Sequence, residues 1–141
     1  MSASFNKFNQ FVQDLADGVH NFGTNTINVG LSNTAPVATN TVWANITEIS
    51  AGNGYTAGGN AAAVTSAAQT AGVFKLILAN PATWTASGTG MGPFRYAVIY
   101  NNTATSKNLI GWYDYGSSIT LNSGEQFQVS FDATNGVLTI T

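Results

Sequence analysis

The sequence predicts a mainly β protein: an antiparallel β-sandwich or barrel-like domain with one amphipathic α-helix at its N-terminus. Short apolar stretches with strand-like alternation recur about every ten residues, and turn-forming Gly, Asn and Pro separate them. The 141 residues are enough for one domain that buries a core without disulfides, which a chain with no Cys cannot form. We therefore expect a single domain over 1–141, with a helix at about 4–19 and a β-rich body at about 26–141.

Residues 4–19 carry the helical pattern. Apolar residues recur there at steps of three and four, which places on one face Phe5, Phe8, Phe11, Val12, Leu15 and Val19. Ser4 is the expected N-cap, and Gly18 marks the expected end. Three phenylalanines are a large apolar surface for one helix, so we expect them to dock on the sheet or on another subunit. Phe5, Phe8 and Phe11 are therefore candidate interface residues.

The first half of the body reads as strands separated by polar loops. Residues 26–31 alternate apolar and polar side chains, as a half-buried strand does. Residues 73–78 are apolar on both faces except for Lys75, which indicates a central strand. The small side chains of 61–71 favour an extended segment after a Gly-rich loop. Between 41 and 49, periodicity does not separate a short helix from an irregular strand.

Residues 92–141 hold the most regular strand pattern. In 94–100, even-numbered and odd-numbered residues fall on opposite faces, and both sets are largely apolar, which indicates a central strand between two layers. Further strands are expected at 109–115, 119–121, 126–131 and 137–140. We expect 119–121 to pair with 126–131. Asn135-Gly136 is a strong hairpin signal, so 126–131 is also expected to pair with 137–140.

The chain carries few charges. Asp, Glu, Lys and Arg make up 7% of its residues, against about 25% in typical domains, and the net charge is −2. The cations are scattered along the chain: Lys7, Lys75, Arg95 and Lys107. We expect no nucleic-acid partner, because these cations form no basic patch. Arg95 is placed to reach Asp114 or a neighbouring subunit. No apolar run is long enough for a membrane helix, so no membrane partner is expected, and no secretory signal peptide is evident.

Two polar loops are the expected contact surfaces of the body. The loop 50–60 is Gly-rich and pinned by Tyr55, and it matches neither the dinucleotide fingerprint nor a P-loop. The loop 101–108 has no apolar anchor and is expected to be exposed. Tyr55, Asn101 and Lys107 from these loops complete the candidate interface residues.

The titratable residues do not suggest catalysis. His20 is the one histidine, which excludes a multi-histidine metal site, and its place after the predicted helix favours a role in capping the helix dipole. A glycosidase would need two of Asp114, Glu125 and Asp132 facing each other in a cleft. Carboxylates beside turns are usually solvated, and Asp14 is expected on the solvated face of the helix. We expect no enzyme activity, no metal and no cofactor.

The aromatic residues leave a binding function open. Trp84 and the Trp112, Tyr113 and Tyr115 group could stack on sugar rings, as in a receptor- or glycan-binding module of a head or tail fibre. Aromatic residues in a central strand more often belong to the core. On that interpretation Ile110 and Trp112 share one face, and Tyr113 and Tyr115 share the other.

Several runs of the sequence resemble a set of small virion proteins encoded beside the capsid genes of tailed bacteriophages and prophages. The runs are FVQDLADGVHNFGTNTINVGLSNTAP (11–36), ITEISAGNGYTAGG (46–59), FKLILANPATWTASG (74–88), GPFRYAVIYN (92–101) and IGWYDYGSSITLNSGEQFQVSFDATNGVLTI (110–140). Their order and spacing span nearly the whole chain and suggest one intact domain starting at Met1.

The resemblance implies a particle component of the head-decoration type. Such proteins bind the outer capsid, often as trimers, and lock the capsomers after expansion. The implied partners are the major capsid protein and further copies of the chain. The implied location is the phage head surface, after assembly in the host bacterial cytoplasm. The family has no catalytic motif, so it assigns no site residues. The low charge agrees independently, since such a surface packs against a lattice with little ionic desolvation.

Overall fold

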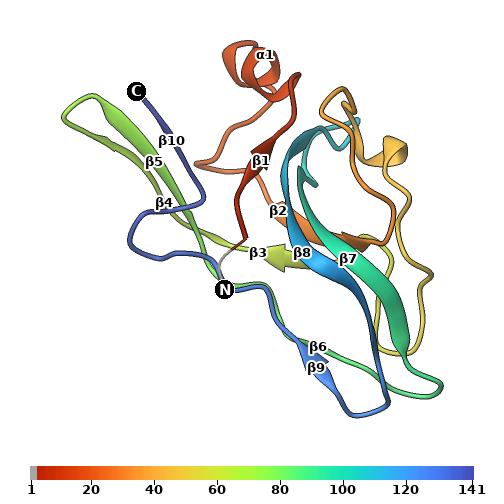
Figure 1. The fold of residues 1–141 in the computed structure, drawn as a ribbon. Helices are drawn as coiled ribbons and strands as arrows, with labels where there is room; N and C mark the ends of the chain where they lie inside the picture. The colour runs from red at the N-terminus through yellow and green to blue at the C-terminus, as the bar shows by residue number, and fades with distance from the viewer. Residues whose placement is uncertain (1–2) are drawn as a thin grey trace.

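The computed structural model describes residues 3–141 and is mainly β, with antiparallel sheets and one short helix near the N-terminus (Figure 1). The larger sheet has five strands in the order β1-β8-β7-β2-β3. Its strands are β1 (Asn6–Lys7), β2 (Ile27–Ser32), β3 (Asn60–Ala62), β7 (Met91–Asn101) and β8 (Leu109–Leu121). The two longest strands, β7 and β8, pair with each other and form the centre of this sheet.

A three-stranded sheet and a short ribbon complete the β structure. The sheet has the order β10-β5-β4, and the ribbon pairs β6 with β9. Their strands are β4 (Val64–Thr70), β5 (Val73–Leu78), β6 (Trp84–Thr85), β9 (Gln126–Phe127) and β10 (Leu138–Ile140). The sheets do not close into a barrel, because the larger one ends at β1 and β3. No helix within residues 3–141 is long and apolar enough to span a membrane.

The core consists of two apolar clusters. Val98 and Tyr100 of β7 belong to the smaller cluster, and Ala97 and Ile99 belong to the larger one. The prediction of a central strand between two apolar layers is therefore confirmed for this strand. The central position of β5 is also confirmed, and the larger cluster includes its residues Leu76 and Leu78, so both sheets share one core.

The predicted helix at 4–19 is wrong over its first half. Asn6–Lys7 forms β1, which pairs with β8, and only Phe11–Ala16 is helical, as α1. Phe5 and Phe8 lie three residues apart in an extended segment, where that spacing points side chains to opposite faces. Phe5 packs against the larger cluster and Phe8 belongs to the smaller one. The three-residue spacing of Phe5 and Phe8, which is typical of a helix, therefore places the two rings on opposite faces of a sheet.

The ends and faces of α1 also differ from the prediction. Ser4 is not the N-cap, since the residue before the helix is Gln10, whose side chain makes no capping hydrogen bond. Gly18 follows the helix with a φ of +80°, the left-handed conformation expected at its end. Val12, predicted on the apolar stripe, is 54% exposed, whereas Asp14, predicted to be solvated, is buried.

The C-terminal strands do not pair as predicted. Residues 119–121 continue β8 and pair with β7, so they form no separate strand with 126–131. Within 126–131, only the first two residues are a strand, β9, and their partner is β6. The side chains of 127, 129 and 131 still point to the core, as the alternation predicts.

Asn135-Gly136 does not form a hairpin. Asp132 accepts hydrogen bonds from the backbone N–H groups of Thr134 and Asn135, both at 2.8 Å, and this closes a local turn. The chain then joins β5 through a hydrogen bond from Val137 N to Leu76 O. β10 consequently pairs with a strand far earlier in the sequence.

The undecided segment 41–49 contains a single 3-10 turn, Trp43–Asn45, and an isolated bridge from Val42 to Asn108. Its Trp43 ring stacks on Tyr100 with 4.3 Å between the ring centroids. This segment therefore packs against the smaller apolar cluster.

Candidate functional site

The three phenylalanines predicted as interface residues pack within the chain itself. Phe8 and Phe11 are 0% and 2% exposed. Phe8 contacts Trp112 with 4.6 Å between the ring centroids, and Phe5 meets Tyr113 edge-on at 5.7 Å. The sequence predicted that these phenylalanines dock on the sheet or on another subunit. In this structure they pack on the chain's own β body.

Tyr55 and Asn101 are likewise buried and do not offer a contact surface. The Tyr55 hydroxyl donates to Glu48 and accepts from Leu31 N, and burial raises the pKa of this phenol. Asn101 accepts from two backbone N–H groups of its own loop. Both residues were proposed because they lie in polar loops, but polar loops also need buried anchors for their backbone groups. Lys107 is exposed, with its Nζ 2.6 Å from Asn102 Oδ1.

The three carboxylates considered for glycosidase chemistry do not act as a pair. Asp114 binds Arg95 with two hydrogen bonds of 2.7 and 3.0 Å, which lowers the pKa of the carboxyl. The expected contact between these two residues is thus confirmed. Glu125 accepts from Asn122 N, and Asp132 holds the turn described above. The pKa of Asp132 is also lowered, chiefly by the backbone N–H of Asn135. A general acid needs a raised pKa, and neither Asp114 nor Asp132 has one.

A buried polar cluster lies where α1 meets the end of β7. The Asn101 amide donates to His20 Nδ1 at 3.1 Å and to Asn25 Oδ1 at 2.8 Å. Asp14 accepts from Asn108 at 2.9 Å. Burial lowers the pKa of His20, although the charge of Asp14 opposes the shift. His20 was expected to cap the helix dipole, an interaction that is favourable for a protonated ring. Its lowered pKa and its hydrogen bond from Asn101 favour a neutral ring with a structural role instead.

An open cleft lies between the centre of the larger sheet and the chain after β9. Its volume is about 590 Å³. Its walls include Tyr113 and Tyr115 of β8, Arg95 of β7, and Phe127 and Phe131 of the C-terminal segment. Gln128, Ser130 and Asp132 add polar groups. A cleft with aromatic walls and a few polar groups can bind a small ligand or a short peptide chain.

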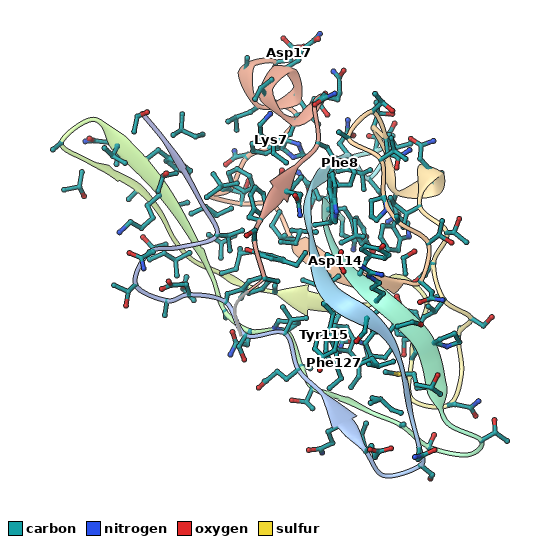
Figure 2. The ribbon with its side chains drawn as sticks, in the orientation of Figure 1. Lys7, Phe8, Asp17, Asp114, Tyr115 and Phe127 are labelled. Carbon is teal, nitrogen blue, oxygen red and sulfur yellow. The ribbon has the colours of Figure 1, made fainter. Side chains whose placement is uncertain are left out.

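Tyr115 is the most accessible ring of this cleft. Its side chain is 54% exposed and meets Phe127 edge-on at 5.9 Å (Figure 2). Tyr113 lies deeper, and burial raises the pKa of its phenol to about 12. Of the other rings considered for sugar binding, Trp84 is buried in the core and Trp112 packs on Phe8. Only part of the predicted aromatic platform is therefore open to a ligand.

Two features of the surface were not anticipated from the sequence. The cleft depends on Phe127 and Phe131 lying opposite β8, which requires the long-range placement of the C-terminal segment. The second feature is β4, an edge strand with no neighbour beyond it in its sheet. Its lack of charge was visible in the sequence, but its position at an edge was not.

No group of three or more His, Cys, Asp or Glu residues able to hold a metal ion occurs among residues 3–141. No family model, no curated protein and no solved structure matches the chain.

Proposed function

We propose that this chain is a non-enzymatic structural protein of a tailed-bacteriophage virion that decorates the outer lattice of the head. Its partners are the major capsid protein and further copies of itself. It is assembled in the cytoplasm of the bacterial host and works on the surface of the phage head. The proposal takes its specific content from the five sequence runs between 11 and 140 that resemble virion proteins.

The observation that carries the proposal is a β body with few free ionic groups. All six carboxylates accept a hydrogen bond from within the chain: Asp14, Asp17, Glu48, Asp114, Glu125 and Asp132. Among the four cations, Arg95 is paired with Asp114, and Lys75 donates to Thr134 O. Such a surface can pack against a protein lattice through shape and hydrogen bonds, with little cost of removing water from charges.

The same hydrogen bonds support a non-enzymatic role. The carboxylates accept from donors in different parts of the chain, and Asp132 is the one carboxylate among the residues that line the cleft beside β8. Catalysis by general acids and bases needs such groups to converge on one substrate position. A rigid scaffold repeated many times on a particle needs only weak contacts per copy, because avidity multiplies them.

Mixing the purified protein with undecorated phage heads tests the proposal. We expect the protein to sediment with the heads and to raise their resistance to heat or to a chelator. Tail structures from the same phage serve as the control particle. If the protein stays in the supernatant and the heads melt unchanged, head decoration is wrong.

A receptor- or glycan-binding module of a head or tail fibre is the second candidate, and exposed Tyr115 in the cleft favours it. Aromatic faces bind the apolar faces of sugars, and Gln128 and Ser130 can bond their hydroxyls. We expect a glycan array to show binding that Tyr115→Ala abolishes while the melting temperature changes little. An array without signal would remove this candidate.

A further inference from the structure

The segment 60–70 changes its neighbour in mid-course. Its first part, β3, pairs with β2, with Ala62 opposite Ile27. At Ala63 the carbonyl oxygen accepts instead from Ala79 N at 2.8 Å, and β4 then pairs with β5. Successive residues of a strand point their backbone groups to opposite edges, so β2 and β5 flank this segment on opposite sides. β2 pairs with β3 but does not extend alongside β4. The edge of β4 on the side where β2 lies therefore has no partner strand.

An open slot lies along this unpaired edge. It has a volume of about 540 Å³, and its walls are residues 22–27 on one side and 61–67 on the other. Most side chains of the second wall are small, including four alanines. The hairpin of β4 and β5 extends away from the larger sheet (Figure 1). An extended chain can therefore approach β4 without displacing large side chains.

Of the features that keep edge strands from pairing, β4 carries one, a bulge between Val64 and Ser66 at one end of the strand. β4 contains seven residues, VTSAAQT, with no charge and no proline. The other sheet ends are short: β1 has two residues, one of them Lys7, and β3 and β10 have three each. Proteins usually protect long exposed edges with lysine, proline, bulges or a covering segment. The regular part of this edge, residues 66–70, is uncharged and has no strand beyond it, so it is suited to strand addition.

We propose that β4 is a self-association edge, and that two copies of the chain pair their β4 strands antiparallel about a two-fold axis. With the axis at Ala67, the middle of the strand, Ser66 faces Ala68 of the copy, within the regular part of each strand. The bulge next to Val64 lies at the two ends of this ladder, beside Gln69 and Thr70 of the copy. No charge meets a like charge, and the two three-stranded sheets become one six-stranded sheet.

The absence of charge on β4 is why a second copy is the occupant, since two such edges meet without like charges. A partner recognised by charge would need charged residues on β4 or along the slot, and residues 22–27 and 61–67 contain none. The pairing adds an association surface to the proposed function and gives a two-fold dimer in place of the trimer that the resemblance implies.

Sedimentation of the purified chain without capsids tests the pairing. We expect a concentration-dependent dimer, and we expect Ala68→Lys to raise the dimer dissociation constant by at least about tenfold at low salt. Thr139→Lys is the matched control, because Ala68 and Thr139 both face Lys75 from opposite edges of one sheet. Its dissociation constant should stay within about twofold of the original. A monomer up to about 1 mM, a trimer, or equal effects of both variants would overturn the proposal.

A cysteine scan gives a direct second readout, since the chain has no Cys of its own. In the two-fold pairing, residue 67 lies opposite its own symmetry mate, within the Cα separation that a disulfide spans. Mild oxidation should link Ala67→Cys into a dimer, while Thr139→Cys stays monomeric. Absence of the Ala67→Cys link, or equal linking of both variants, would contradict the two-fold axis. Because no capsid is used, failure here leaves head decoration to be judged by its own experiment.

Discussion

His20 lies among aromatic rings at the end of the N-terminal segment. Its ring stacks on Phe22 at 5.9 Å and lies 5.3 Å from Phe11. Asn101 donates to its Nδ1, and Asp14 is the charged group that influences it most. Burial lowers the pKa of His20 from its ordinary value of 6.5, so the neutral ring is the form that the fold accommodates.

This environment predicts a loss of stability in acid. The unfolded chain takes up the His20 proton as the pH falls below about 6.5, whereas the folded chain resists protonation down to its lower pKa. The contribution of neutral His20 to the free energy of unfolding should therefore be complete above pH 6.5. It should decrease as the pH falls from 6.5 to the lower pKa of the folded chain. Denaturant titrations of the original chain and of His20→Gln across this range check the effect. Equal pH slopes for the two proteins would contradict the assignment.

Gly30 is required by its contact with Trp43. A Cβ added at Gly30 would overlap the Trp43 ring, which itself stacks on Tyr100. We expect Gly30→Ala to cost about 1–3 kcal/mol of unfolding free energy, as overpacking usually does. In a Trp43→Leu background the same substitution should cost clearly less. Equal costs in both backgrounds, measured by urea denaturation, would show that the ring is not the cause.

In the N-terminal segment, the buried residues are not the ones that the helical pattern predicts. Phe8 precedes α1 and is fully buried, whereas Val12 within α1 is 54% exposed. We expect Phe8→Ala to cost about 3–5 kcal/mol and Val12→Ala to change stability by no more than about 0.5 kcal/mol. Thermal or urea unfolding of both variants measures this difference. Similar losses in both would mean that the predicted helical stripe, with Val12 inside it, forms in solution.

Some elements could be predicted from the sequence, because the pattern of apolar residues within the element itself indicates which side chains are buried. The run 73–78 is apolar on both faces except for Lys75, and it is the central strand of its sheet. The alternation in β7 likewise assigned Ala97 and Val98 to opposite clusters. In β8, however, Ile110 packs against the larger cluster and Trp112 lies against the smaller one, contrary to the expected shared face. A shift in register between Ile99 and Tyr100 accounts for this, because a bulge reverses the alternation.

Other elements depend on partners distant in the chain, which local patterns do not encode. Asn135-Gly136 is a sequence typical of a hairpin turn. In the structure, Asp132 accepts a hydrogen bond from Asn135 N and closes a different turn, and the strand that follows, β10, pairs with β5. The same limit applies to the candidate sites. Their positions in polar loops predicted that Tyr55 and Asn101 are exposed, yet both side chains are buried and accept hydrogen bonds from the backbone N–H groups of Leu31 and Thr103. The unpaired edge of β4 also depends on the long-range arrangement of the strands, because β4 is an edge strand only in the order β10-β5-β4.

The whole molecule offers two distinct surfaces on one scaffold. The aromatic cleft lies beside β8, and the unpaired edge belongs to the hairpin of β4 and β5, which extends away from the larger sheet (Figure 1). The two sheets share one core, and each of the six carboxylates accepts a hydrogen bond from within the chain. A particle component could use one surface for its own copies and keep the other for the lattice or a ligand.

Titrating the purified chain against undecorated heads, with bound protein counted by sedimentation, tests the central claim most directly. We predict saturable binding with a fixed number of copies per head, because a repeating lattice offers a fixed number of equivalent sites. Binding to tails should stay at background. Binding that rises without a plateau, or that is equal on heads and tails, would contradict head decoration.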